Sequence, residues 1–180
     1  RKNKMKIIGF AGSNSSTSIN KKLVTYVTSL ISNVEIEILD LNDYELTLIG
    51  VDLEKEIGQP ELATQFLQKI NSADLLVVSL AENNGNYSVA FKNIFDWASR
   101  QEKNVFQNKD MILMATSPGG RGGATVLEIA KNSFPRYGAN IVATFSLPKF
   151  YENFDVENNT ISNSDFEKEV KDIVEQIRNK

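Results

Sequence analysis

The chain has 180 residues, with 20 Lys and Arg against 23 Asp and Glu, a formal net charge of -3, and neither cysteine nor histidine. These counts exclude cysteine nucleophiles, disulfides, iron–sulfur ligation, Ser-His-Asp triads and histidine-ligated zinc. The small net charge offers no broad basic surface, so we expect no binding to nucleic acid. No apolar stretch is long enough for a membrane span or a secretory signal, so we expect a cytoplasmic protein that does not bind membranes. The length is that of one domain, over residues 1–180.

Short apolar runs, rich in β-branched residues, predict five strands at 6–11, 34–39, 74–80, 110–116 and 140–145. Apolar residues at helical spacing predict five helices at 19–31, 62–70, 91–98, 126–134 and 166–177. Segment 40–60 has no clear hydrophobic period, and its length is typical of a functional or interface loop. The simpler interpretation is that its acidic side chains are only solvated.

Strict alternation of strands and helices predicts an α/β, doubly wound fold, in which helices cover both faces of a five-stranded parallel sheet. The first strand is not followed by G-x-G-x-x-G, so the dinucleotide-binding strand order is disfavoured and the order 2-1-3-4-5 is expected. In that order the loops at 12–20, 81–88 and 116–123 converge on one crevice beyond the carboxyl ends of the strands.

The first of these loops, "GSNSSTSIN", places hydroxyl groups and the amide of Asn20 at the start of a helix. Free backbone N–H groups and hydroxyls at a helix N-terminus suit a phosphate. Lys21 and Lys22 lie at the unfavourable end of the helix dipole, a mismatch that a bound phosphate would relieve. A serine-rich helix cap with exposed lysines explains the same residues equally well.

The other two loops suit a flat ligand. "AENNGNYS" offers the carboxylate of Glu82, amides, a permissive Gly85 and the aromatic face of Tyr87, whereas "TSPGGRGG" is dense in glycine and lacks the P-loop pattern. Each has a simpler interpretation: a polar turn followed by the helix cap Ser88, and a flexible glycine turn.

Together, "GSNSSTSIN", "AENNGNYSVAFKNIFDW" and "SPGGRGG" resemble the NADPH-dependent FMN reductases of the flavodoxin-like superfold, which include quinone, chromate and azo-dye reductases. The likeness covers residues 5 to 145. Its middle motif, approximately P-E-Y-N-x-x-Y-x-x-x-L-K-N in the family, is the most specific, and the residues in register with it are Glu82, Asn84, Tyr87, Lys92 and Asn93.

The resemblance implies FMN as cofactor, NADPH or NADH as co-substrate, and a small-molecule electron acceptor. It implies that the first loop holds the FMN phosphate, that the middle loop borders the isoalloxazine ring, and that the third loop closes the opposite side. The implied cofactor-binding residues are Ser13, Ser15, Ser18, Ile19, Asn20, Glu82, Asn83, Asn84, Gly85, Tyr87, Ser117, Pro118, Gly119 and Gly120. Lys92 and Asn93 are expected to have a structural or interface role, and no metal ligand or catalytic side chain is implied.

The chain departs from the family pattern in both loops. Ser15 stands where the family commonly has an arginine, so weaker FMN binding is expected, with Lys21 or Lys22 compensating in part. Ala81 and Val89 stand in place of prolines, and Asn83 in place of a tyrosine.

The implied activity is a ping-pong reaction in which NAD(P)H passes hydride to FMN and leaves before an acceptor such as a quinone enters. Two alternatives stay open: a flavodoxin-type electron carrier, and a non-enzymatic protein whose FMN site has decayed. The resemblance also implies a homodimer or homotetramer. Phe91, Phe95 and Trp97 widen the apolar arc of one helix, which fits an interface or, as we favour, the core.

Overall fold

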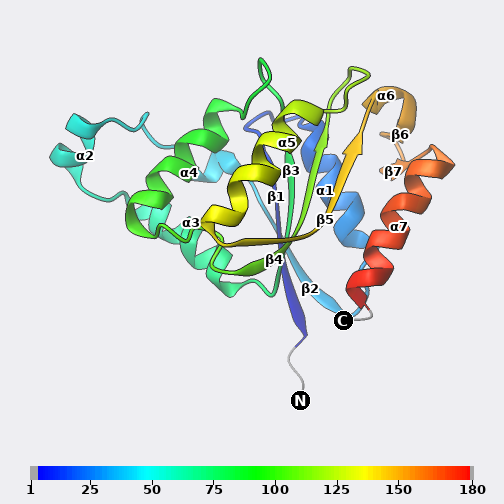
Figure 1. Ribbon diagram of the computed structural model, residues 1–180, viewed down its shortest axis with the longest axis horizontal. Helices are drawn as coiled ribbons and strands as arrows, with labels where there is room; N and C mark the ends of the chain where they lie inside the picture. The colour runs from blue at the N-terminus through cyan, green and yellow to red at the C-terminus, as the bar shows by residue number, and fades with distance from the viewer. Residues whose placement is uncertain (1–3, 179–180) are drawn as a thin grey trace.

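The computed structural model describes residues 4–178, and a five-stranded parallel sheet forms its centre (Figure 1). The strands lie in the order β2-β1-β3-β4-β5, which confirms the predicted order. Their bounds are β1 Met5–Gly12, β2 Val34–Leu39, β3 Leu75–Leu80, β4 Lys109–Thr116 and β5 Ala139–Leu147. Every residue of β3 is buried, as expected for a central parallel strand that is covered on both faces.

Helices cover both faces of the sheet, which confirms the doubly wound architecture (Figure 1). One face packs against α1 (Ile19–Ser29) and α7 (Ser164–Arg178). The other packs against α3 (Glu61–Ser72), α4 (Val89–Gln101) and α5 (Ala124–Ser133). A short 3₁₀ helix, η2 (Phe134–Tyr137), leads from α5 into β5.

The wide apolar arc of α4 belongs to the core. Phe91, Phe95 and Trp97 are 1%, 8% and 0% exposed. The ring of Phe95 stacks on Phe134, with centroids 6.2 Å apart and planes 11° apart. Burial of each such side chain stabilises the fold by about 1.5–3 kcal/mol. The core interpretation of these three residues is therefore confirmed.

Segment 40–60 contains more regular structure than its sequence indicated. It forms a 3₁₀ helix, η1 (Leu41–Tyr44), and a short helix, α2 (Val51–Ile57), none of whose residues is buried. Asn93 on α4 holds the chain between them, since its Nδ2 donates to the Leu46 carbonyl at 2.9 Å and its Oδ1 accepts from the Ile49 N–H at 2.9 Å. The structural role expected for Asn93 is thus visible.

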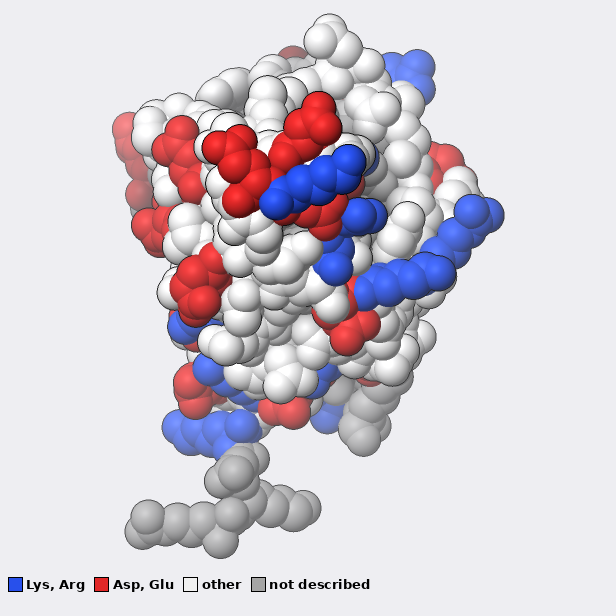
Figure 2. Space-filling model, turned by 90° about the vertical axis from the view of Figure 1, so that its left-hand side faces the viewer, with Lys and Arg blue, Asp and Glu red and all other residues white. Residues whose placement is uncertain are grey.

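The end of the molecule that carries α2 is exposed and mixed in charge. α2 projects beyond α4 in Figure 1, and Figure 2 shows this side of the molecule, where acidic and basic side chains are interspersed among uncharged surface. An ion pair between Arg100 Nε and Glu54 Oε1, 2.8 Å apart, ties α2 to α4. Several apolar side chains on and beside α2 stay uncovered: Leu48, Val51 and Ile57 are 65%, 67% and 52% exposed.

The chain between β5 and α7 forms a small unit that the sequence pattern did not predict. It consists of a short helix, α6 (Phe150–Asn153), and a two-stranded antiparallel hairpin, β6 (Phe154–Asp155) and β7 (Thr160–Ile161). The unit lies beside α1 in Figure 1 and joins the core on that face through Phe150, Phe154 and Ile161.

Within residues 4–178, no helix combines the length and apolar character needed to cross a membrane. The same residues include no group of three or more His, Cys, Asp or Glu side chains placed to hold a metal ion.

Gly122 fixes the path of the loop that follows β4. Its φ is +58°, and a Cβ there would lie 2.5 Å from Ser146 Oγ and 2.7 Å from the nitrogen of Pro148. Gly122→Ala is therefore expected to lower the free energy of unfolding by about 2–4 kcal/mol, because backbone strain and overpacking add. Gly120→Ala, whose Cβ would meet nothing within 4 Å, is the matched control. Urea denaturation measures both, and equal losses would contradict this account.

Candidate functional site

The three loops predicted to converge do meet at the carboxyl edge of the sheet, around an open cavity of about 270 Å³. The edge lies where the order of the strands reverses, between β1 and β3. The residues that line the cavity are Ser13, Ser15, Thr17, Ser18, Ile19, Asn20, Ala81, Glu82, Asn83, Thr116, Ser117, Pro118 and Tyr151. None of these residues is a lysine or an arginine.

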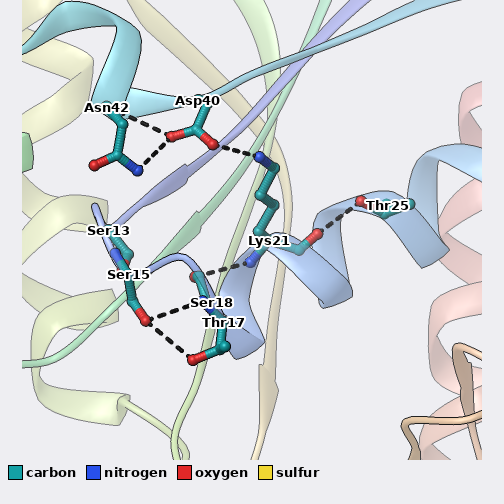
Figure 3. A network of polar contacts seen from close by, with 8 residues as sticks. All are labelled: Ser13, Ser15, Thr17, Ser18, Lys21, Thr25, Asp40 and Asn42. Atoms are coloured by element: carbon teal, nitrogen blue, oxygen red, sulfur yellow. Dashed lines mark hydrogen bonds and ion pairs between the residues drawn. The ribbon is translucent and has the colours of Figure 1, made fainter.

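The first loop is organised by its own hydroxyl groups (Figure 3). Ser13 Oγ accepts from the N–H of Ser15 at 3.1 Å, and Ser15 Oγ lies 3.4 Å from Thr17 Oγ1. Ser18 caps α1, because its Oγ accepts from the N–H of Lys21 at 3.1 Å. The loop thereby presents a row of hydroxyl groups along one side of the cavity.

Backbone donors at this helix start stay available. The N–H groups of Ser16, Ile19 and Asn20 take part in none of the hydrogen bonds found among residues 4–178. The first N–H groups of a helix have no partner within the helix, and they point toward its positive end. Hydroxyls and unused N–H groups together form a neutral binding surface for an anion.

Lys21 is directed away from this surface. Its Nζ forms an ion pair with Asp40 Oδ2 at 2.7 Å, just beyond the end of β2 (Figure 3). The ammonium group of Lys21, together with the N–H of Asn42, holds the pKa of the Asp40 carboxyl below its usual value. Lys22 lines a separate cavity on the outer side of the loop, with Ser16 and Thr17. Neither lysine lines the central cavity.

Asn20 joins the first loop to the ends of two strands. Its side chain is 2% exposed, and its Oδ1 accepts from Ser79 Oγ at 2.7 Å and from the N–H of Thr116 at 3.0 Å. Its Nδ2 donates to the carbonyl of Thr116 at 3.2 Å. Asn20 therefore lines the cavity floor while most of its hydrogen-bonding capacity holds α1 against β3 and β4.

The middle loop is a tight turn. Asn83 and Asn86 exchange backbone hydrogen bonds of 2.9 and 3.0 Å, while Asn84 and Gly85 between them have φ values of +51° and +74°. An Asn-Gly pair with two positive φ values is typical of a type I′ turn, whose twist suits paired extended segments. Asn83 lines the cavity, whereas Asn84 and Gly85 lie outside its lining, at the tip of the turn.

Two side chains fasten this turn to the neighbouring loops. Glu82 Oε2 accepts from the N–H of Val126, in the first turn of α5, at 2.9 Å. The residue at the N-cap position of α5 is Gly123, which has no side chain, so Glu82 caps this helix instead. Ser88 Oγ accepts from the N–H of Phe91 at 3.2 Å and donates to the carbonyl of Gly12 at 2.8 Å. One hydroxyl thus caps α4 and also holds the first loop.

The side chain of Tyr87 leaves the cavity and enters the core. Its ring stacks on Phe134, with centroids 6.0 Å and planes 14° apart, and its Oη lies 2.9 Å from Ser133 Oγ. Burial raises the pKa of the Tyr87 hydroxyl, which keeps it neutral at physiological pH. Tyr87 is not among the residues that line the cavity, and its predicted contact with a flavin stays a prediction.

The third loop contributes Ser117 and Pro118 to the cavity, whereas Gly119 and Gly120 lie exposed beyond the lining. The first half of this loop is held by the chain that follows β5. Phe150 donates its N–H to the Ser117 carbonyl at 3.1 Å, and Lys149 donates to the Gly119 carbonyl at 2.9 Å. The chain that follows β5 therefore supports the third loop and contributes to the same side of the site.

The lining includes Thr17, whose hydroxyl belongs to the predicted phosphate loop, and three residues for which the sequence indicated no ligand contact: Ala81, Thr116 and Tyr151. Thr17, Ala81 and Thr116 lie within or beside the three predicted loops, so an inspection of whole loops rather than selected polar residues would have found them. Tyr151 follows β5, in a segment without hydrophobic periodicity. Only the three-dimensional arrangement shows that it lines the cavity.

The site fits a phosphate-bearing, largely flat molecule. Hydroxyl groups and free N–H groups of the first loop lie at one end of the cavity. The middle loop, with Asn83 just beyond the end of β3, lies between the first and third loops. Glu82, the one acidic residue of the lining, caps α5 and does not belong to the first loop. A phosphate at the first loop therefore meets donors and no carboxylate from the lining.

The sheet order and the site at its carboxyl edge define a flavodoxin-like α/β protein. Over 96% of this chain and 94% of the other, the structure superposes on the flavoenzyme NAD(P)H:(acceptor) oxidoreductase FerB of Paracoccus denitrificans, with a TM-score of 0.74 and 24% identity. A model of the family described as NADPH-dependent FMN reductase matches residues 5–152. The chain belongs to this family of FMN-dependent, NAD(P)H-using reductases.

Two curated relatives illustrate the family. The chain is 32% identical to an NADPH:quinone oxidoreductase of Arabidopsis thaliana, over 66% of this chain and 61% of that protein. It is 29% identical to an NAD(P)H-dependent FMN reductase of Pseudomonas aeruginosa, over 67% of this chain and 64% of that protein. The match thus spans less than two thirds of the length of either relative.

Asn20→Ala tests whether the buried amide holds the site together. The change leaves the Ser79 hydroxyl and the Thr116 N–H without their acceptor, and we expect it to lower the free energy of unfolding by about 2–4 kcal/mol. Asn14→Ala, in the same loop but exposed, is the matched control and is expected to change it by no more than about 0.5 kcal/mol. Urea denaturation of the FMN-free protein, followed by Trp97 fluorescence, measures both. A loss at Asn20 as small as that at Asn14 would refute the role.

Proposed function

We propose that the chain binds FMN in the cavity at the carboxyl edge of the sheet and transfers hydride equivalents from NADPH or NADH to a small acceptor such as a quinone. The observation that carries this proposal is the convergence of the three loops on one cavity with a neutral anion-binding end. When bound, FMN supplies the redox chemistry, accepting a hydride from the nicotinamide and passing reducing equivalents on.

The first loop is the proposed phosphate end. Ser13, Ser15 and Ser18 supply hydroxyl groups, and Ile19 and Asn20 supply backbone N–H groups at the start of α1. These donors stay close to their binding positions because hydrogen bonds within the loop and the buried amide of Asn20 hold them. Binding the phosphate therefore requires little additional ordering of the chain.

The remaining loops are the proposed ring end. Asn83 and the backbone near Glu82 form one wall, and Ser117 and Pro118 form the other. We propose that the tips of the middle and third loops lie over the ring and contact it. The residues at these tips are Asn84, Gly85, Gly119 and Gly120. Tyr87 is proposed to support the turn from behind, since its ring packs against Phe134.

The protein's own contribution to the reaction is binding and orientation. The chain has no histidine or cysteine, and the half-buried hydroxyl of Tyr87 is neutral at physiological pH and bonded to Ser133, so we assign no side chain as general acid or base. The open cavity leaves one side of a bound ring accessible. Nicotinamide and acceptor are proposed to use that side in turn, which gives ping-pong kinetics. The names of the quinone-reducing relatives support a quinone as acceptor.

A homodimer is proposed through the α2 end of the molecule. Leu48, Val51 and Val89 are 65%, 67% and 66% exposed, and a second copy that covered them would remove apolar surface from water. The hydrogen bonds from Asn93 and Trp97 to segment 46–49 hold part of this surface in a fixed shape. A cytoplasmic location, as predicted from the sequence, is part of the same proposal.

The reductase proposal predicts that the purified protein binds FMN and that the visible absorbance of the bound flavin changes with reduction and reoxidation. It is expected to bind FMN, to lose the visible absorbance of the flavin when NADPH or NADH is added without oxygen, and to regain it when a quinone follows. Absorbance spectroscopy measures each step. Reoxidation by the quinone alone separates a reductase from an electron carrier, which needs a partner protein. Protein that stays colourless in excess FMN would overturn the proposal in favour of a decayed site.

The dimer proposal predicts a sedimentation coefficient above that of a 20.1 kDa monomer at micromolar concentration. Val51→Lys places a charge in the proposed interface and is expected to give monomers, because an unpaired charge opposes burial. Val156→Lys, at a site that is 42% exposed on the β6–β7 hairpin, is the control and should leave the assembly unchanged. A monomeric parent protein would disprove the dimer.

A further inference from the structure

Tyr151 is a large aromatic residue that lines the cofactor cavity yet is 67% exposed. It belongs to α6, the short helix that follows β5, and it lies outside the three loops that form the rest of the site. An exposed aromatic side chain with a polar tip at the mouth of a cavity is well suited to contact a ligand there.

The position of Tyr151 is fixed by its neighbours on both sides. The preceding residue, Phe150, is fully buried, and its ring stacks on Phe154 with centroids 4.6 Å apart and planes 20° apart. Backbone hydrogen bonds from Lys149 and Phe150 to the third loop measure 2.9 and 3.1 Å. The backbone of Tyr151 is therefore held while its side chain stays in contact with solvent.

This small unit stands at the phosphate end of the cavity. Phe154 packs edge-on against Tyr26 of α1, with centroids 6.1 Å apart. Asn159, in the β6–β7 hairpin, lines the outer cavity together with Ser16 and Thr17 of the first loop. Thr17 also lines the central cavity beside Tyr151. Two independent sets of neighbours thus place the unit against α1 and the first loop.

The phosphate end lacks the strong donor that its chemistry favours. No lysine or arginine lines the cavity, and the ammonium group of Lys21, in the first turn of α1, is paired with Asp40. A hydrogen bond from a neutral donor to a charged acceptor is stronger than one between neutral groups. A phenolic O–H at this end would recover part of the missing affinity.

We propose that the hydroxyl of Tyr151 donates a hydrogen bond to the phosphate of the bound FMN and thereby supplies part of the affinity that a cationic side chain would otherwise give. This inference rests on the proposed function, because it assumes that FMN occupies the cavity with its phosphate at the first loop. Tyr151 then determines specificity, since it favours FMN over riboflavin, which has the same ring and ribityl chain but no phosphate.

Tyr151→Phe removes only the hydroxyl, and at so exposed a position it leaves the fold intact. We expect it to weaken FMN binding about five- to tenfold and to leave riboflavin binding unchanged. Quenching of flavin fluorescence measures both dissociation constants. Tyr137→Phe, on η2 at the other face of the sheet, is the matched control and should change neither.

A second substitution tests the proposed replacement. Ser15→Arg in the Tyr151→Phe background supplies a charged donor to the same phosphate and is expected to restore FMN binding at least to the parent level. Ser16→Arg, one residue along but lining the outer cavity, should restore less. Equal restoration by both would point to a general charge effect and count against a specific phosphate contact.

The outcomes separate this inference from the proposed function. If the parent protein binds FMN and Tyr151→Phe binds it equally well, the role of Tyr151 is refuted and the reductase proposal stands. Equal weakening of FMN and riboflavin would also refute it, because a structural or stacking role has that signature. Parent protein that binds no FMN would overturn both.

Discussion

The buried amide of Asn20 is the contact on which the geometry of the site depends. In a parallel sheet the carboxyl ends of neighbouring strands are not joined by turns, since each strand leads into a crossover helix. The backbone ladder pairs β1 with β3 up to Gly12 and Leu80, and β3 with β4 up to Leu80 and Ala115, so the loops beyond these residues must be held by other contacts. Asn20 does this for α1, β3 and β4 with three hydrogen bonds from one residue that is 2% exposed. In a buried setting each of these bonds matters, because a polar group left without a partner costs about 1–3 kcal/mol.

Other polar side chains of the site extend this network to the remaining loops. Ser88 joins the middle loop to the first through the carbonyl of Gly12, and Glu82 joins it to the third by capping α5 at the N–H of Val126. Each therefore has a structural use besides any contact with a ligand. The groups left for the ligand include the hydroxyls of the first loop and of Tyr151, the amide of Asn83 and backbone N–H groups, and none of them is a cation.

The sequence predicted the fold well and the site in part, for physical reasons that particular residues illustrate. Alternating apolar runs determine a parallel sheet, and its strand order determines where the loops meet, so the convergence of 12–20, 81–88 and 116–123 followed from topology. The direction of a side chain depends on partners from distant segments. Tyr87 faces Phe134, 47 positions further along the chain, and nothing near Tyr87 in the sequence indicates this. Tyr151 escaped detection because its helix, Phe150–Asn153, is too short to show a period.

A neutral phosphate end has a consequence for how such a protein functions. Affinity that comes from hydroxyls, helix N–H groups and a phenol is short-ranged and directional, whereas a guanidinium adds a long-range attraction that salt screens. The chain therefore depends on donors held in place more than on charge, and the network around Asn20 is what holds them. Because FMN supplies the redox chemistry, a chain without histidine or cysteine loses nothing essential to that chemistry. Selection of the cofactor and its orientation are left to the protein, and in the proposed site both depend on the loops at the carboxyl edge of the sheet.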